Sequence, residues 1–205
     1  TVLWLWRHAC RGAASDVETC LRIVPLFEKI GDLKRSDETL SAILTEPVYA
    51  EHLAAQANRQ MVMVGYSDST KDGGYLSACW GLYDAQRRIS AAAAAHDVHV
   101  TFFHGRGGSL GRGGGPAARG ILSLPPEALD GTLRLTEQGE VLAERYDDVQ
   151  IAFRHLEQVS WATLVGSTIH PAEPAEAWLA LTDRLASRSY AVYRELVDQP
   201  GFITF

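Results

Sequence analysis

The amino-acid sequence predicts an α/β protein in which helices cover a mostly parallel β-sheet. The first observation is that short, continuously apolar runs alternate with longer segments of helical periodicity, a pattern typical of parallel sheets buried on both faces. The second is that the first three apolar runs each lead directly into polar residues. The chain has 205 residues, of which 46% are apolar and 21% charged. It is therefore long enough for one domain with a sizeable core.

Four apolar runs predict the strands. The first is 21–27 (LRIVPLF), in which Pro25 weakens the pattern because proline has no amide hydrogen to donate to a neighbouring strand. Residues 61–64 (MVMV) and 98–103 (VHVTFF) have the pattern of fully buried strands, and 132–136 (TLRLT) predicts a fourth.

Helical patterns fill the intervals between these runs. Residues 36–44 begin with Ser and Asp and continue with apolar residues at helical spacing. Residues 47–57 have a proline in their first turn, 74–96 predict a long helix, and helical patterns dominate from 139 onward with a break near 166–174. Eight of the 18 glycines lie within 105–120, so we expect no regular helix there.

Composition excludes several classes of protein. The formal net charge of −6 argues against a nucleic-acid-binding platform, which is usually basic. Cys10, Cys20 and Cys79 include no closely spaced pair, so we expect neither a disulfide framework nor a zinc site. No apolar run approaches the roughly 18 residues of a membrane span. We therefore expect a cytoplasmic protein without a membrane or nucleic-acid partner, whose Trp and Tyr side chains lie in the core.

Polar residues at the ends of the predicted strands are the candidate site. The carboxyl ends of parallel strands meet at one edge of a sheet, where ligand sites form. Glu28 and Asp68 carry oxygen ligands of the kind that Mg²⁺ or Mn²⁺ binds. Asp72 is a second carboxylate near Asp68, and the alternative interpretation is that it is simply an acid in the first turn of a helix. Lys71 and His104 would add a positive charge and a hydrogen-bond donor. For each residue the alternative remains that strands simply end in polar loops.

The glycine-rich segment is a second candidate. Backbone amides of Gly107 and Gly108 could approach an anion closely, and Arg106 and Arg112 could bind phosphate or carboxylate oxygens. The segment matches no nucleotide-binding pattern, since Leu110 stands where a dinucleotide motif has its third glycine and no Lys-Ser or Lys-Thr follows. A solvent-exposed flexible loop is the alternative interpretation.

Four motifs resemble those of the phosphoenolpyruvate carboxylase family. Residues 65–74 (GYSDSTKDGG) resemble its GYSDSxKDxG motif, and 104–116 (HGRGGSLGRGGGP) resemble its glycine-rich loop. Residues 24–28 (VPLFE) and 136–140 (TEQGE) are similar to two further motifs, in the order of the family. The resemblance covers the chain from about residue 18 onward.

The resemblance implies part of a helix-rich (β/α)₈ barrel, of the TIM type, as one partial domain over 1–205. Barrel elements would occupy about 20–140, and 141–205 would be mainly helical. The implied reaction joins phosphoenolpyruvate and bicarbonate to give oxaloacetate and phosphate, through carboxyphosphate and the enolate of pyruvate, with Mg²⁺ or Mn²⁺. A homotetramer is implied for the full-length protein, with an aspartate or malate inhibitor as a further ligand.

The resemblance also implies a role for each matched residue. The metal ligands would be Glu28 and Asp68. The implied catalytic residues are Lys71, His104 and Arg112, and the implied substrate-binding residues are Arg106, Gly107, Gly108 and Gln138.

Several segments of the family have no counterpart here, among them its TAHPT motif. A (β/α)₈ barrel needs about 250 residues, so we expect a fragment that is inactive by itself. Two alternatives remain open at this point. One is a non-catalytic module that binds phosphoenolpyruvate or a dicarboxylate, and the other is a different kind of phosphoryl-transfer enzyme.

Overall fold

The computed structural model describes residues 1–11, 21–105, 117–137, 139–169, 174–202 and 204. Its described strands form one four-stranded parallel sheet in the order β1-β2-β3-β4. The strands are β1 (Leu26–Phe27), β2 (Arg59–Gly65), β3 (His99–Gly105) and β4 (Arg134–Leu135). The sequential order and the parallel directions confirm the predicted α/β class, and no closed barrel is seen among the described residues.

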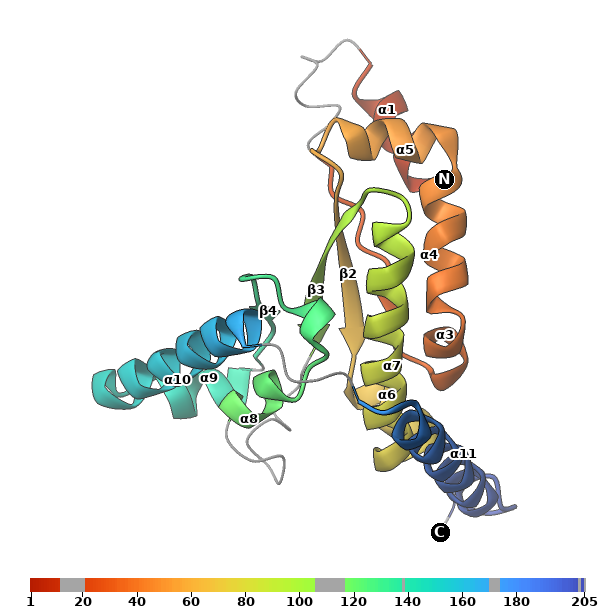
Figure 1. Cartoon of the computed structure of the whole chain (residues 1–205), viewed down its shortest axis with the longest axis vertical. Coiled ribbons are helices and arrows are strands. Elements are labelled where there is room, and N and C mark those ends of the chain that lie inside the picture. Colours follow the sequence, from red (N-terminus) through yellow and green to blue (C-terminus); the bar gives the residue numbers. More distant parts are fainter. Residues whose placement is uncertain (12–20, 106–116, 138, 170–173, 203, 205) are drawn as a thin grey trace.

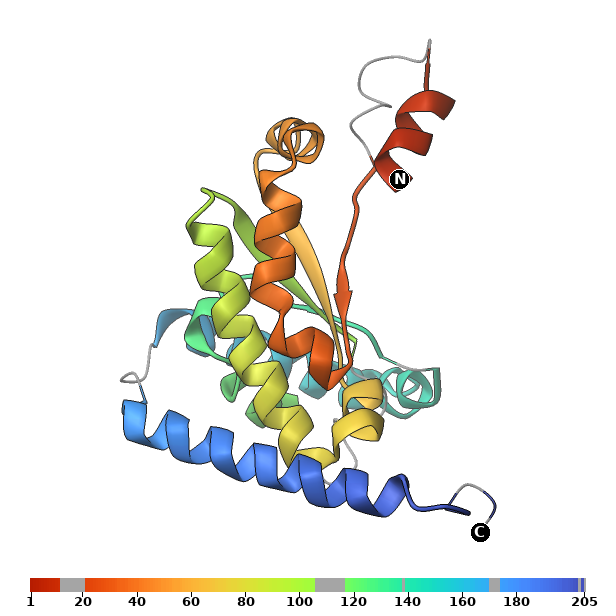
Figure 2. The same cartoon turned by 90° about the vertical axis from the view of Figure 1, so that its right-hand side faces the viewer.

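Helices occupy most of the remaining described chain (Figure 1). They are α1 (Val2–Ala9), α3 (Ile30–Lys34), α4 (Ser36–Thr45), α5 (Pro47–Ala54), α6 (Ser67–Gly73), α7 (Tyr75–Ala94), α8 (Ala117–Leu122), the 3₁₀ turn η2 (Pro126–Ala128), α9 (Gly139–Tyr146), α10 (Val149–Thr168) and α11 (Glu176–Val197). Helix α11 crosses the ends of α6 and α7, as Figure 2 shows. None of the helices in the described part of the chain is both long and apolar enough to cross a membrane.

The main core lies between the sheet and helices α3, α4 and α7. Val62 and Val64 of β2 and Phe102 of β3 lie on the same face of the sheet, because side chains alternate along a strand and these residues pair in register. The face packs against a buried cluster that includes Leu33, Leu40 and Ile89. A second, smaller cluster joins α8 and α10 through Ile121, Leu129 and Ala162.

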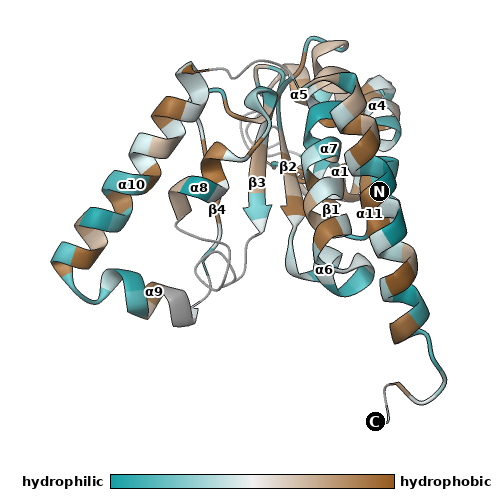
Figure 3. Ribbon diagram, turned by 60° about the horizontal axis from the view of Figure 1, so that its bottom comes forward, coloured by the Kyte–Doolittle hydropathy of each residue, from teal (hydrophilic) through white to brown (hydrophobic). Residues whose placement is uncertain are grey.

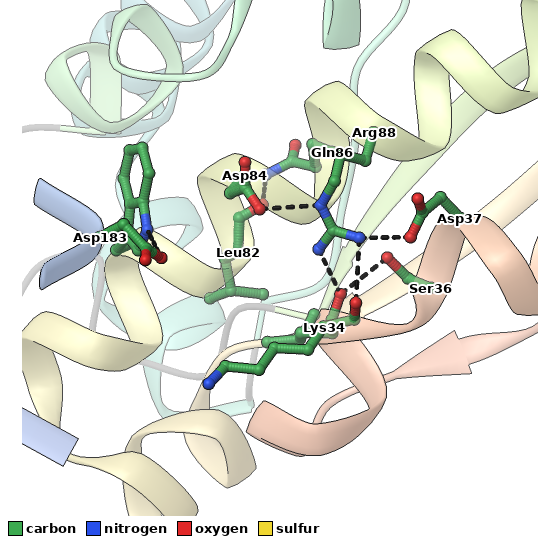
Figure 4. A network of polar contacts seen from close by, with 10 residues as sticks. Lys34, Ser36, Asp37, Leu82, Asp84, Gln86, Arg88 and Asp183 are labelled. Atoms are coloured by element: carbon green, nitrogen blue, oxygen red, sulfur yellow. Dashed lines mark hydrogen bonds and ion pairs between the residues drawn. The ribbon is translucent and has the colours of Figure 1, made fainter. Parts of the chain in front are cut away.

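Arg88 of α7 links α7 to α3 and α4 (Figure 4). Its guanidinium group donates to Asp84 Oδ2 at 2.8 Å, to the Leu33 carbonyl at 2.8 Å and to the Lys34 carbonyl at 3.1 Å. It also pairs with Asp37. A single planar donor group therefore satisfies two carbonyls at the end of α3 and two carboxylates.

The first predicted strand is much shorter than expected. Only Leu26 and Phe27 pair with β2 in register. The Pro25 carbonyl still accepts from the Met63 amide at 2.8 Å, but two carbonyls further upstream bind side chains. Gln56 donates to the Leu21 carbonyl at 2.8 Å, and Gln60 donates to the Ile23 carbonyl at 3.0 Å. Side-chain amides thus take the place of a backbone ladder in this segment.

Several predicted helix limits also change. The helix expected over 47–57 ends at Ala54, because Ala57 and Asn58 adopt positive φ values of 57° and 52° as the chain turns into β2. The helix expected from Gly74 begins at Tyr75, and Gly74 precedes it with φ 76°. Part of the glycine-rich segment is helical, because α8 begins at Ala117 in its alanine-containing end.

The expectation that Trp and Tyr side chains lie in the core is wrong for several of them. Trp4, Tyr75, Trp161 and Trp178 are between 54% and 72% exposed, whereas Tyr49 is buried. Figure 3 shows apolar positions on α10 and α11. Trp161 lies on α10 and Trp178 on α11, so both helices expose large aromatic side chains.

Candidate functional site

The carboxyl ends of the strands bring the candidate residues to one edge of the sheet. Glu28 follows β1, Asp68 and Lys71 lie on α6 directly after β2, and His104 lies at the end of β3. The register pairs Phe27 with Val64 and Val64 with His104, so the three strands end at the same level.

Glu28 lies directly against the end of β2. A Cβ atom at position 65 would stand 2.6 Å from the Cβ atom of Glu28 and 3.1 Å from its Oε2 atom. Glycine at position 65 therefore leaves the space that the Glu28 side chain occupies. Ser69 Oγ donates to the carbonyl oxygens of both Glu28 and Gly65, which fixes the start of α6 against the end of β1.

Asp68 and Lys71 lie on the solvent-facing side of α6. Lys71 Nζ is 3.1 Å from Asp68 Oδ1, and the two side chains are 73% and 54% exposed. An exposed pair of this kind contributes little stability. Asp68 is thus accessible to a ligand, with a positive charge beside it.

Asp72 differs from its predicted role as an acid in the first turn of a helix. It lies in the last turn of α6, since that helix spans Ser67–Gly73. Its Oδ2 atom accepts from the Ile30 amide at 2.8 Å. The carboxylate therefore joins α6 to the segment that follows Glu28.

His104 is a buried side chain with only 1% of its surface exposed. Its Nδ1 atom is 2.9 Å from the Tyr66 hydroxyl, and its ring packs near Phe102. Because His104 and Phe102 alternate with Phe103, the histidine lies on the face of the sheet that packs under α7. The hydrogen bond to Tyr66 connects the segment after β2 with the end of β3.

The remaining predicted site residues lie outside the described part of the chain. These residues are Arg106, Gly107, Gly108, Arg112 and Gln138.

A buried polar cluster that the sequence analysis missed lies directly before Gln138. Glu137 pairs with Arg145, and its Oε1 atom is 3.1 Å from His155 Nε2. Their side chains are 10–16% exposed. Burial alone would raise the pKa of Glu137, but hydrogen bonds from Tyr146 and Arg145 and the charges of Arg145 and His155 hold that pKa below its usual value. The only sequence signal is the acid of the TEQGE motif itself.

Burial and the Glu137 hydrogen bond raise the pKa of Tyr146 to about 12, so this hydroxyl stays protonated and acts as a donor. The cluster therefore ties the segment before α9 to the last turn of α9 and to α10.

The oxygen atoms of Glu28 and Asp68, at the edge of the sheet, are of the kind that a divalent cation binds. Glu28 and Asp68 offer two carboxylates from neighbouring strand ends, and Mg²⁺ and Mn²⁺ sites are commonly completed by water and substrate oxygens. The space beside Gly65 holds the Glu28 carboxylate at this edge. No cluster of three or more His, Cys, Asp or Glu side chains arranged for a metal occurs among the described residues. Glu28 and Asp68 would therefore provide two protein ligands.

The fold and site together define an α/β protein with an acidic, ligand-accessible edge on a parallel sheet. The model of the phosphoenolpyruvate carboxylase family matches residues 1–205. The chain therefore belongs to the phosphoenolpyruvate carboxylase family, as the motifs predicted.

Curated relatives agree with this assignment. The chain is 48% identical over 208 residues to the phosphoenolpyruvate carboxylase of Xanthomonas euvesicatoria pv. vesicatoria, covering 100% of this chain and 23% of that protein. It is 46% identical to that of Mycobacterium leprae over 89% of this chain and 20% of that protein. It is 44% identical to the phosphoenolpyruvate carboxylase of Rhodothermus marinus over 98% of this chain and 22% of that protein. The chain thus spans about a fifth to a quarter of these relatives.

Proposed function

We propose that this chain forms one part of the active site of a phosphoenolpyruvate carboxylase, which converts phosphoenolpyruvate and bicarbonate to oxaloacetate and phosphate. The observation that carries the proposal is the placement of Glu28, Asp68 and Lys71 at one edge of a parallel sheet in a member of this family. The sheet would be one segment of a (β/α)₈ barrel, because its strands follow one another in sequential parallel order.

Glu28 and Asp68 would hold Mg²⁺ or Mn²⁺. When bound, the cation supplies Lewis-acid stabilisation of the negative charge that both substrates carry. Lys71 lies beside Asp68 and would neutralise further charge on the substrate. In this assignment, Asp68 binds the cation through the carboxylate that Lys71 otherwise pairs with.

The glycine-rich segment would bind the anionic substrates. Arg106, Gly107 and Gly108 would contact phosphoryl oxygens through guanidinium and amide donors, and Arg112 would stabilise the carboxylate and enolate charges. Gln138 would bind substrate from the segment after β4. Enclosure of the enolate would exclude water, which would otherwise protonate it to pyruvate.

His104 would act from its buried position. Its hydrogen bond with Tyr66 fixes the end of β3, from which residues 106–116 continue. We propose that this contact aligns Arg106 with the phosphoryl group, and that His104 contributes to catalysis through this alignment.

Metal binding tests the assignment. In the full-length carboxylase, Asp68→Asn and Glu28→Gln should each weaken Mn²⁺ binding by more than about tenfold, since each removes one of the two proposed protein ligands. Electron paramagnetic resonance of free Mn²⁺ gives the dissociation constant. Asp32→Asn is the matched control, because Asp32 is an exposed acid on α3. Unchanged Mn²⁺ affinity in both ligand variants would rule out the assignment.

Arg112→Ala should separate substrate chemistry from metal binding. We expect a large loss of carboxylation with Mn²⁺ affinity close to that of the parent enzyme, because arginine does not bind the cation. Equal losses of carboxylation and metal binding would contradict the role proposed for Arg112. By itself the 205-residue chain should show no carboxylation, since it spans 23% of the length of a complete relative.

A further inference from the structure

Two residues of α11 hold the last turn of α6. The Tyr193 hydroxyl donates to the Lys71 carbonyl at 2.7 Å, and Arg194 Nη1 donates to the Asp72 carbonyl at 3.4 Å. Arg194 Nη1 is also 3.9 Å from Asp72 Oδ1. We call Tyr193 and Arg194 the α11 clamp.

The clamp supplies donors that α6 itself lacks. The last four carbonyls of a helix have no donor within that helix. In α6 the Thr70 carbonyl accepts from the Gly74 amide, and the next two carbonyls along the chain are those of Lys71 and Asp72. Donors located 122 residues further along the chain thus complete the end of this short helix.

Gly74 allows the clamp to approach closely. Its φ of 76° is a conformation that residues with a side chain rarely adopt. A Cβ atom at this position would also lie 3.1–3.3 Å from three atoms of the Tyr193 side chain. The tyrosine therefore packs directly on the turn between α6 and α7.

The opposite side of α6 is joined to the end of β1. Asp72 Oδ2 accepts from the Ile30 amide, two residues after Glu28, and Ser69 Oγ donates to the Glu28 carbonyl. Asp72 thus contacts both the segment after Glu28 and the α11 clamp. A shift of α6 away from α11 would also disturb the position of α6 relative to Glu28.

We propose that Tyr193 and Arg194 are positioning residues for the divalent-cation site. They hold α6 in the position at which Asp68 and Glu28 bind one cation and Lys71 lies beside it. The inference rests on the proposed function, because it takes Glu28 and Asp68 as the metal ligands. Neither Tyr193 nor Arg194 needs to contact metal or substrate to act in this way.

Tyr193→Phe in the full-length carboxylase is the sharpest test. It removes the hydroxyl donor to Lys71 and keeps the ring that packs on Gly74. We expect the Mn²⁺ dissociation constant to rise about three- to tenfold, the effect of losing one hydrogen bond. We also expect the KM for Mn²⁺ to rise in parallel, while kcat at saturating Mn²⁺ and the thermal unfolding temperature stay close to the parent values.

Thr182→Val is the matched control, because Thr182 lies on the same helix and its hydroxyl donates within that helix, to the Trp178 carbonyl. It should leave the Mn²⁺ dissociation constant unchanged. Arg194→Ala should raise that constant, and Arg194→Lys should restore part of the loss by providing a positively charged donor. This rescue distinguishes positioning from general damage to α11.

The outcomes separate this inference from the proposed function. If Glu28→Gln and Asp68→Asn weaken Mn²⁺ binding but Tyr193→Phe and Arg194→Ala do not, the clamp has no positioning role. An equal effect of Thr182→Val and Tyr193→Phe would likewise overturn it. If both ligand variants bind Mn²⁺ normally, the metal-site assignment itself is wrong, whatever the clamp variants show.

Discussion

Substituting Gly65 with alanine should displace Glu28. The added methyl group would stand 2.6 Å from the Glu28 Cβ atom, which is 0.4 Å less than the 3.0 Å below which real Cβ atoms essentially never approach another heavy atom. The Glu28 Cβ atom is fixed to its backbone, so rotation of the side chain cannot relieve the overlap. The ends of β1 and β2 must therefore separate.

The structure gives a scale for the effect. Overpacking by one methyl group in a close-packed site costs about 1–3 kcal/mol. If Glu28 moves to relieve this strain, the loss appears in cation binding, where about 1.4 kcal/mol corresponds to a tenfold change. We expect Gly65→Ala in the full-length carboxylase to raise the Mn²⁺ dissociation constant at least about fivefold.

Gly31→Ala is the matched control for this experiment. Gly31 lies on α3, three residues after Glu28, and a Cβ atom there would meet no atom within 4 Å. Alanine is the better helix former, so this variant should be as stable as the parent or slightly more stable. A folded Gly65→Ala enzyme that binds Mn²⁺ as tightly as Gly31→Ala would refute the reasoning about Glu28.

Three further perturbations test the core, the Arg88 contacts and the Glu137 cluster. Leu33→Ala should destabilise the α3 region by about 2–5 kcal/mol because Leu33 is fully buried, whereas Leu181→Ala should have little effect because Leu181 is 48% exposed. Native-state hydrogen exchange of the α3 and α4 amides measures both, and equal losses of protection would contradict the core assignment. Arg88→Lys should lower stability by about 1–3 kcal/mol, since a lysine cannot satisfy two carbonyls and two carboxylates together. A thermal unfolding temperature equal to that of the parent would show that the contacts of the guanidinium are dispensable. The pKa of Glu137 is lower in the folded than in the unfolded chain, so its ionised form contributes stability above the ordinary value of 4.5 and loses it as the pH falls through the folded value. The difference in unfolding temperature between the parent and Glu137→Gln should therefore shrink below about pH 4.5, and a constant difference from pH 6 to pH 3 would exclude this linkage.

Strong local patterns predicted the central elements well. The runs at 61–64 and 98–103 became β2 and β3, and the helix expected over 36–44 is α4. In these segments local preference and tertiary packing agree, because the apolar residues face the same core that their spacing predicts. The placement of Glu28, Asp68 and Lys71 at one edge of the sheet could be predicted for a similar reason, since residues that follow parallel strands meet there. Their roles at that edge stay predictions.

The first strand shows why weaker patterns failed. Residues 21–25 are apolar enough for a strand, but Pro25 lacks an amide hydrogen and only two residues pair with β2. The carbonyls of Leu21 and Ile23 accept from Gln56 and Gln60, on the segment that leads into β2 and in β2 itself. Competition between a backbone ladder and side-chain amides more than 30 positions away is not visible in a local window of sequence.

The α11 clamp shows a different limit of sequence patterns. Spacing marks an apolar side on α11, and Trp178, Leu181 and Leu185 on that side are exposed. Ala186 instead is buried, and Tyr193 and Arg194 contact α6. Amphipathic spacing therefore predicted the helix but not the side that packs on the candidate site. Hydrogen bonds to the last carbonyls of α6 depend on where that helix ends, and Gly74 determines its end through a positive φ. The proposed positioning role of α11 thus rests on the tertiary structure, whereas the acidic residues that it would position were predicted from the sequence.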